Sequence, residues 1–322
     1  MAQPTNLYDR YDAGTNVRED LIDAITRTQP EKTPVVSSFG TGTSAQTFHE
    51  WQRDNLRAPN ADNAAIDGDD ATPSAKTPPI RVANICQIFQ DTIATSRRAN
   101  RVKKAGMKSS QAYHKAKAYK ELQRDIEARV LSSKAAVAGS GAAASQMGGL
   151  GVMIYTNALH NGTGATAAHT SGAPTAAVTA GTNRTFTEAL LKTAAQSAFT
   201  SSGEVPRMVV VSPSHKTTFS AFAGIAVNRN QVKSGQQASI VGGADIYMSD
   251  FGEMEIVPHY MQVGSTTVYG LNTDYGSMDY LDGFQSQPLA KTGDSEKEQV
   301  LVDVTLRLDS ENVHFKIADL TP

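Results

Sequence analysis

A long amphipathic pattern covers residues 107–133, which contain neither proline nor glycine. Apolar residues recur there every three or four positions and so share one side of an α-helix. They are Ala112, Ala116, Tyr119, Leu122, Ile126 and Val130. Asp125 stands four residues before Arg129, a spacing that brings opposite charges together on a helix. Because Ser109 or Ser110 can cap the first turn, we expect a helix of roughly 35–40 Å that acts as a spine.

Near the end of the chain the pattern changes from helical to alternating. Five apolar residues share one parity, with mostly polar residues between them. They are Val300, Val302, Val304, Leu306 and Leu308. This alternation predicts a long strand with one buried face. A second, short strand is expected after Asn312.

Residues 39–105 predict a long two-stranded ribbon. The outgoing half, TSAQTFHEWQRDNL, is rich in Thr, Phe and Trp, and the returning half, IRVANICQIFQDTIATS, alternates. Between the halves, residues 59–79 supply the prolines, glycine and aspartates of turns and loops. A two-stranded ribbon is marginally stable in water by itself. We therefore expect this one to lie against other chains.

Residues 185–285 predict a compact α/β unit. Thr185 and Glu188 form a capping-box pattern ahead of an apolar helix. The run RMVVVS is typical of a buried strand, and Pro213 opens a second helix, with Phe219 on its inner face. ADIYMSDFGEMEIVPHYM predicts two strands joined by a turn, and TTVYGL and GSMDYL add two more.

Two further stretches carry less pattern. Residues 134–184 are mostly small and predict loops, with one strand or helix start at 150–155. Residues 1–38 are polar and contain prolines, and only a short helical pattern interrupts them. Such a segment would be flexible alone, so a neighbouring subunit is expected to hold it.

Composition narrows the class of protein. The 322 residues carry a formal net charge of −2, which argues against a protein whose main role is to coat nucleic acid. Cys86 is the single cysteine, so no internal disulfide or thiolate metal cluster can form, which suits folding in a reducing compartment. The start of the chain lacks the apolar core of a signal peptide. No run approaches the ~18 apolar residues that span a membrane.

Several segments, in this order along the chain, carry a resemblance. They are RVANICQIFQDTIATS leading to RVKKAGMKSSQAYHKAKAYKELQRDIEARVL, then TFTEALLKTAAQSAF followed by VVVSP, DIYMSDFGEMEIVPH, and PLAKTGDSEKEQVLVDVTL. In these segments the chain resembles the major capsid proteins of tailed bacteriophages, which have the Hong Kong 97-type fold. The match is most similar to major head proteins of podoviruses and siphoviruses.

The resemblance implies an α+β fold divided into four parts. An N-terminal arm would occupy residues 1–38 and an extended β-ribbon loop residues 39–105. A peripheral domain, built on the spine helix, would combine 106–185 with 286–322, and an axial α/β domain would occupy 186–285. In this family, axial domains meet at the centre of pentamers and hexamers, and the loop and arm lie across neighbouring subunits.

Neither catalytic nor metal or cofactor sites are predicted. The seven histidines show no helical zinc spacing and are not grouped with the cysteine. The run from Gly139 to Ala144 imitates a dinucleotide loop but follows a helix rather than a strand. Asp67, Gly68, Asp69 and Asp70 lack the later glutamate of a calcium loop, so a loop tip is expected.

The residues expected to matter are contacts between subunits. The aspartates at the loop tip, Asp69 and Asp70, would meet arginines of an adjacent subunit, and Trp51 lies in the same ribbon. The densest basic cluster would contact an acidic patch on a neighbour or, less favoured, the genome. Its members are Arg97, Arg98, Arg101, Lys103 and Lys104. Lys76, the one lysine between Lys32 and Lys103, has no identifiable partner for the isopeptide bond formed in some relatives.

These interpretations support a structural function. We expect a major capsid protein whose pentamers and hexamers form an icosahedral head around double-stranded DNA, assembled in the host bacterial cytoplasm. Portal and scaffolding or decoration proteins are expected partners, and no membrane is. The alternatives are an encapsulin-like compartment shell and, third, a hydrolase or nucleotide-binding enzyme built on 186–285, for which no motif is found.

Overall fold

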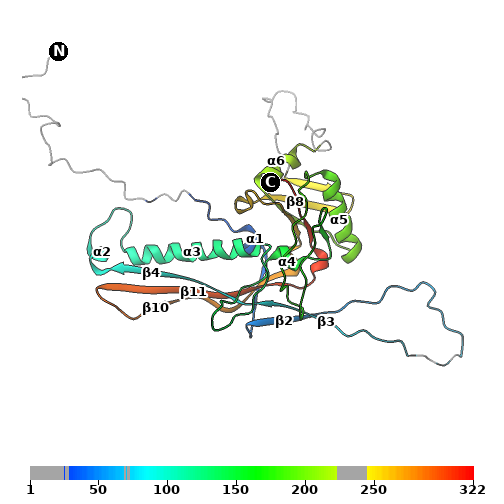
Figure 1. The fold of residues 1–322 in the computed structure, drawn as a ribbon, viewed down its shortest axis with the longest axis horizontal. Helices are drawn as coiled ribbons and strands as arrows, with labels where there is room; N and C mark the ends of the chain where they lie inside the picture. Colours follow the sequence, from blue (N-terminus) through cyan, green and yellow to red (C-terminus); the bar gives the residue numbers. More distant parts are fainter. Residues whose placement is uncertain (1–24, 26–28, 69, 71–72, 223–244) are drawn as a thin grey trace, which may run out of the picture.

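The computed structural model describes residue 25, residues 29–68, residue 70 and residues 73–222 and 245–322. Figure 1 shows a long helix and a long sheet side by side, a lobe of shorter strands and helices at one end, and an extended loop beyond it.

The spine helix α3 spans Ser110–Val130. Ser109 caps it and accepts a hydrogen bond from the amide of Ala112, as predicted. Its buried stripe is Ala118, Leu122, Ile126 and Val130. The expected burial of Ala112 and Ala116 is wrong, because both are exposed.

Polar side chains explain that difference in the first half of the helix. The positions that face the sheet there are Gln111 and Lys115, and both bind Glu298, at 3.2 and 2.5 Å. The expected pairing of Asp125 with Arg129 is also wrong. The Arg129 guanidinium is buried and instead donates to the carbonyl oxygens of Met147 and Ala135.

A four-stranded sheet lies against α3, in the order β1-β10-β11-β4. Its strands are β1 (Gly40–Thr43), β10 (Gly276–Pro288), β11 (Ser295–Leu308) and β4 (Gln87–Ser96). The five alternating residues predicted on β11 are all buried, at 0–2% exposure. They form a core with Phe89 and Ile93 of β4 and the buried stripe of α3. The prediction of a long strand with one buried face is confirmed.

The two-stranded ribbon is shorter than predicted. Only β2 (Phe48–Arg53) and β3 (Ile80–Ile85) pair, antiparallel, over six positions. The rest of the predicted returning strand is β4, which pairs with β11. The physical reason is burial, since Phe89 and Ile93 gain a core beside α3 that a free ribbon would not offer.

A six-stranded sheet forms the lobe at the other end, in the order β5-β12-β9-β6-β8-β7. Its strands are β5 (Ala158–Leu159), β12 (Phe315–Ile317), β9 (Val268–Leu271), β6 (Met208–Val211), β8 (Gly252–Pro258) and β7 (Ile246–Ser249). Helices α5 (Glu188–Ser202) and α6 (Pro213–Ser220) supply a second core against it. The predicted hairpin β7–β8 and the buried strand β6 are confirmed.

Three details of this lobe differ from the sequence prediction. Thr187, not Thr185, caps α5, through the amide of Leu190. The segment GSMDYL begins β10 and so belongs to the four-stranded sheet. The short strand expected after Asn312 exists as β12, but it pairs with β9 in the six-stranded sheet. Both ends of the predicted axial unit are thus interleaved with the rest of the chain.

Short elements complete the described part of the chain. They are α1 (Pro34–Ser38), α2 (Arg97–Arg101), α4 (Leu150–Met153) and the 3₁₀ turns η2 (Tyr260–Gln262), η3 (Thr273–Tyr275) and η4 (Glu311–Val313). The first four residues of the apolar island at 150–155 form α4. The glycine-containing run at 139–144 lies in a loop closed by a bridge between Val137 and Gln146.

The segment 29–38 lies along α3 and is fixed there by one buried carboxylate. Glu127 of α3, fully buried, accepts the amides of Val35 and Val36 at 2.9 and 2.7 Å. The same carboxylate contacts Nε2 of His259, also buried, at 2.8 Å. Lys120 pairs with Glu31 farther along the helix. Because a buried carboxylate needs such partners, Glu127 determines where α1 begins.

The variant Glu127→Ala is expected to lower the free energy of unfolding by about 3–5 kcal/mol. The substitution leaves two backbone amides and the ring of His259 without their acceptor. Urea unfolding followed by the fluorescence of the single tryptophan, Trp51, measures this change.

The matched control is Glu121→Ala on the same helix. Its carboxylate is half-exposed and pairs with Lys117 at the surface, a contact worth about 0.3–0.5 kcal/mol. Equal losses in the two variants would contradict the role given to Glu127.

Candidate assembly surfaces

One face of β2 attaches the ribbon to the body of the molecule. Residues 49, 51 and 53 alternate with exposed neighbours along the strand and so share a side. Nε2 of His49 contacts Asp279 at 2.8 Å, the indole of Trp51 donates to the carbonyl oxygen of Leu308 at 2.9 Å, and Arg53 reaches Glu311 at 3.3 Å. These three contacts, one at every second residue of the strand, fix the direction in which the ribbon leaves the body.

Asp279 lies at the inner end of this face and is almost fully buried. Besides His49, it contacts the guanidinium of Arg307 at 3.1 Å and accepts the hydroxyl of Ser277 at 2.7 Å. These partners come from β2, β11 and β10. One carboxylate therefore joins the ribbon to the middle of the four-stranded sheet.

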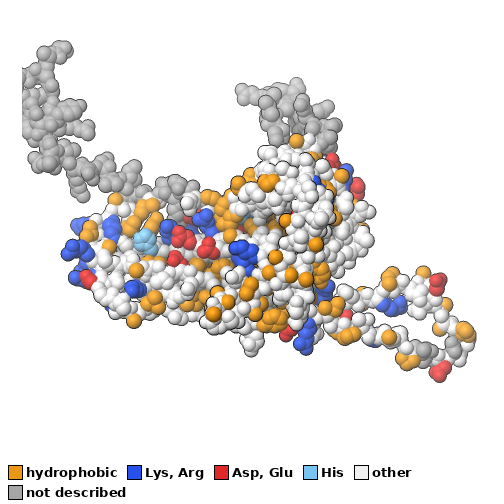
Figure 2. All heavy atoms as spheres, in the orientation of Figure 1, with side chains coloured by type: hydrophobic (Ala, Val, Ile, Leu, Met, Phe, Trp, Pro, Cys, Tyr) orange, Lys and Arg blue, Asp and Glu red, His pale blue; other side chains and the backbone are white. Residues whose placement is uncertain are grey.

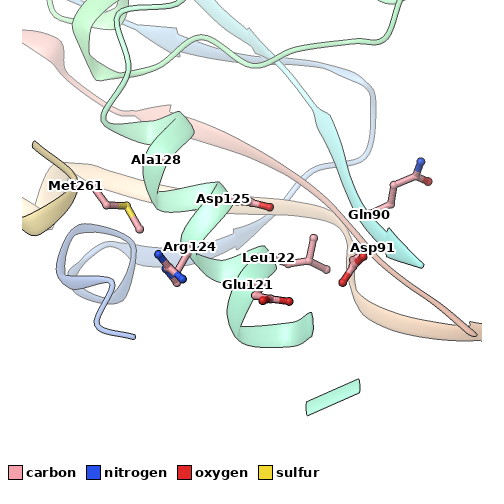
Figure 3. Close-up of a pocket in the computed structure, with 8 residues that line it drawn as sticks. All are labelled: Gln90, Asp91, Glu121, Leu122, Arg124, Asp125, Ala128 and Met261. Atoms are coloured by element: carbon pink, nitrogen blue, oxygen red, sulfur yellow. The ribbon is translucent and has the colours of Figure 1, made fainter. Parts of the chain in front are cut away.

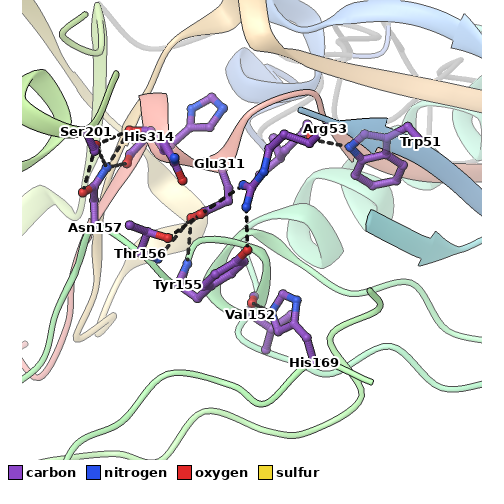
Figure 4. A network of polar contacts seen from close by, with 12 residues as sticks. Trp51, Arg53, Val152, Tyr155, Thr156, Asn157, His169, Ser201, Glu311 and His314 are labelled. Atoms are coloured by element: carbon purple, nitrogen blue, oxygen red, sulfur yellow. Dashed lines mark hydrogen bonds and ion pairs between the residues drawn. The ribbon is translucent and has the colours of Figure 1, made fainter. Parts of the chain in front are cut away.

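Glu311 forms the outer end of the same attachment (Figure 4). It is 4% exposed and accepts the amides of Tyr155 and Thr156, at 3.3 and 3.1 Å, and the hydroxyl of Thr156. Arg53 bridges it to the hydroxyl of Tyr155, 3.0 Å away. Figure 4 shows this group between the ribbon and the turn that leads to β12.

Asn157 continues the network into the six-stranded lobe (Figure 4). Its side-chain amide donates to the carbonyl oxygens of Asn312 and His314, at 2.6 and 3.1 Å, and its oxygen accepts the hydroxyl of Ser197 at 2.8 Å. His314 is fully buried, and its Nδ1 accepts the amide of Asn272 at 3.1 Å. The network thus links the ribbon base to α5 through the C-terminal segment.

Beyond β2 and β3, the loop has little contact with the rest of its own chain. Every described residue from 54 to 79 is exposed, among them Leu56 at 98% and Ile66 at 77%. Figure 1 shows the loop projecting away from the body. Of the predicted contact residues here, Asp70 is exposed, Asp69 lies outside the described residues, and Trp51 faces its own subunit's body.

The predicted basic cluster lies around α2, at the opposite end of the molecule from the loop (Figures 1 and 2). Arg97 pairs with Asp294 at 2.8 Å, although both side chains are largely exposed. Lys104 donates to the hydroxyl of Ser110. Arg98, Arg101 and Lys103 are exposed. The structure therefore brings the five cations together on one tip.

An open groove of about 570 Å³ lies between α3 and β4 (Figure 3). Its acidic lining residues are Asp91, Glu121 and Asp125, with Arg124 and Met261 beside them. Desolvation in the groove raises the pKa of Asp125 above its ordinary value, against the opposite effect of Arg124. The neighbouring carboxylates raise that pKa further.

Two searches of the described residues bear on other functions. No group of three His, Cys, Asp or Glu side chains in that part of the chain could hold a metal ion. None of its helices is both long and apolar enough to cross a membrane.

The buried carboxylates Glu127, Asp279 and Glu311 are not among the contact residues predicted from the sequence. Each is a charged residue inside or beside an apolar pattern, such as Asp279 within GSMDYL. That interruption is the signal that could have marked them, since a buried charge needs a partner.

His314 makes the stability of the fold depend on pH. Burial lowers its pKa to about 4, against the opposing effect of a backbone contact at Tyr275. As the pH falls below the ordinary value of 6.5, the unfolded chain takes up a proton before the folded one does. Stability from this residue is therefore complete above pH 6.5 and is lost toward pH 4, by about 3 kcal/mol.

Chemical unfolding at a series of pH values from about 7.5 to about 4 measures how the free energy of unfolding changes with pH. The variant His314→Asn removes the titrating group and is expected to flatten the slope, while His160 and His215, whose pKa values burial also lowers, keep part of it. His114→Asn, at an exposed position, serves as the control. An unchanged slope in His314→Asn would contradict the assignment.

Known proteins are similar to this chain in sequence or in fold. The model of the SU10 major capsid protein family matches residues 3–321. A curated relative, the major capsid protein of Escherichia phage Phieco32, is 31% identical over 135 residues. That alignment covers 42% of this chain and only 38% of the relative.

Solved capsid structures match over nearly the whole chain. The cyanophage A-1(L) capsid asymmetric unit is similar with a TM-score of 0.65 and 14% identity, over 96% of this chain and 99% of the other. The phage G structure of gp27 major capsid proteins and gp26 decoration proteins gives a TM-score of 0.52 and 10% identity, over 100% of both chains. These likenesses establish the Hong Kong 97-like α+β fold. Since its family model covers all but the first two residues and the last, the chain belongs to the SU10 major capsid protein family.

Proposed function

We propose that this chain is the major capsid protein of a tailed bacteriophage. Many copies, arranged as pentamers and hexamers, form the icosahedral head that encloses the double-stranded DNA genome. The family match supports a phage head rather than the encapsulin-like compartment considered as an alternative. The protein is located in the virion, and its assembly takes place in the host bacterial cytoplasm.

The observation that carries the proposal is the loop 54–79, which is anchored firmly at its base and exposed at every residue that the structure describes in it. Its base is held by His49, Trp51 and Arg53. Its described residues are all exposed, apolar side chains included. Ordering an exposed loop costs conformational entropy, which contacts with a second copy would offset. Such contacts, repeated around a shell, add up to a stable lattice.

Charge supports a particular way for copies to meet. The loop carries aspartates at its tip, including Asp62, Asp67 and Asp70, and the opposite end of the molecule carries the basic cluster around α2. Opposite charges at opposite ends favour head-to-tail contact between different copies. We infer that the cluster serves subunit contact rather than binding of the genome.

Other partners follow from the class of particle. A head that is filled with DNA needs a portal, and scaffolding or decoration proteins are further candidates. In phage G, the solved capsid pairs its major capsid protein with the decoration protein gp26. We propose a structural role without enzymatic activity.

Shell formation by the purified protein tests the proposal. Negative-stain microscopy and size-exclusion chromatography are expected to show rings, shells or tubes. The double variant Leu56→Ser with Ile66→Ser is expected to form far fewer of them, while the unfolding free energy of the unassembled chain changes by less than about 0.5 kcal/mol. Both side chains are exposed in the isolated chain.

Two controls accompany that variant. Val263→Ser changes an apolar residue that is also exposed, at 73%, but lies far from the loop in the sequence, and should leave assembly unaffected. Leu122→Ala in the core is the control for lost stability. It is expected to lower the free energy of unfolding by about 2–5 kcal/mol. A persistent, well-folded monomer of the unmodified protein at high concentration would refute the proposed function.

The basic cluster is tested by the triple variant Arg98→Ala, Arg101→Ala and Lys103→Ala. If it serves subunit contact, empty shells assembled without DNA should form less readily, and the defect should grow as salt is lowered toward conditions where the unmodified contacts are strongest. The exposed Lys134→Ala is the control. Normal empty shells combined with reduced DNA content would instead assign the cluster to the genome.

A further inference from the structure

The hairpin β7–β8 of the six-stranded sheet is exposed on one of its two faces. Tyr247 points toward α5 and α6, where its hydroxyl donates to Glu188 at 3.1 Å and its ring lies 5.8 Å from that of Phe219. Met254 and Ile256 are buried on the same side. Alternation along the strands therefore places the residues between them on the opposite face of the sheet.

That opposite face is both apolar and acidic. Ile246 is paired across the strands with Glu255, and Met248 with Glu253. Ile246 is 53% exposed, Met248 is 80% exposed, and both glutamates are exposed. Neither glutamate has an ion pair with any described residue. We call these four residues the hairpin face.

The rest of the same sheet face is covered by the chain itself. Met208 and Val210 of β6, and Tyr269 and Leu271 of β9, pack into the core beneath α3 and α4. The hairpin face continues this covered surface outward, to the edge strand β7. Met248 lies on this edge strand itself, and an exposed apolar side chain at the edge of a sheet is typical of a contact surface.

The sequence of this chain contains a segment of matching chemistry. Residues 223–244 carry Arg229 and Lys233, no aspartate or glutamate, and several β-branched apolar residues. This segment leaves the described fold after Phe222, on the α6 side of the sheet, and returns at Asp245, directly before β7. Its charge and apolar content complement those of the hairpin face.

We propose that the hairpin face binds residues 223–244 of an adjacent copy of this chain within a ring. This inference rests on the proposed function, because it names the partner of the axial lobe in a capsomer. A closed ring of identical chains needs two different surfaces that fit each other, and the acidic hairpin face and the basic segment form such a pair. Cation–carboxylate contacts with Glu253 and Glu255 select the partner, and burial of Ile246 and Met248 holds it.

Charge reversal tests the proposal in the full-length chain. The first variant carries Glu253→Lys and Glu255→Lys, and the second carries Arg229→Glu and Lys233→Glu. Each by itself places like charges at every contact of the ring, so native mass spectrometry should show roughly tenfold or more loss of capsomers. The first variant should keep the circular dichroism melting curve of the unmodified chain, because the changed glutamates are exposed, and the same measurement checks the fold of the second.

An equimolar mixture of the two variants separates contact between copies from contact within one copy. In an alternating ring, each reversed face meets an oppositely charged segment, so hexamers should return in the mixture. If only the chain carrying all four substitutions assembles and the mixture does not, the segment covers its own hairpin and the proposal is wrong. Normal assembly of both single-surface variants would overturn it as well.

The apolar half of the hairpin face has its own control. Met248→Ser is expected to reduce capsomers, whereas Val263→Ser, an exposed apolar position outside the face, is not. If the unmodified chain forms no capsomers under any condition, the proposed function fails. If it forms them and these variants do so equally well, the hairpin face alone is misassigned.

Discussion

The attachment of outlying segments by buried carboxylates is the constraint on which the rest of the structure depends. Glu127 holds the segment before β1, Asp279 and Glu311 hold the ribbon, and Asp319 holds the loop at 161–181 through the amides of Asn161 and Gly181. A carboxylate removed from water needs its hydrogen-bond donors in place. Each such group therefore permits one position of its segment and penalises the others.

This arrangement suits a chain with little core for its length. Hydrophobic residues make up 39% of the sequence, and in the described part of the chain the buried clusters are divided between the layer under α3 and the lobe around α5. Apolar burial holds each of these bodies together but is not directional. The carboxylates add direction at their margins, where the chain leaves one body for another or for open solvent.

The sequence predicts regular elements well where one periodicity meets one buried layer. The alternation from Val300 to Leu308 predicts β11 correctly because this strand pairs on both sides, with β10 and β4, and packs one face on a single core. It predicts partners poorly, because pairing is not local. The segment 80–96 reads as one alternating strand, yet β3 pairs with β2 and β4 with β11. Contact residues were predicted from charge density, which identifies an exposed tip such as α2 but not a buried anchor such as Glu311.

The position of the ribbon base has a mechanical consequence. His49, Trp51 and Arg53 are tied to β10, to the end of β11 and to the turn before β12. β11 lies in one sheet and β12 in the other, so a pull on the projecting loop is delivered at the joint between them. The loop would therefore pivot about residues 307–311. Tension in a lattice of copies would be transmitted to both sheets of every subunit at once.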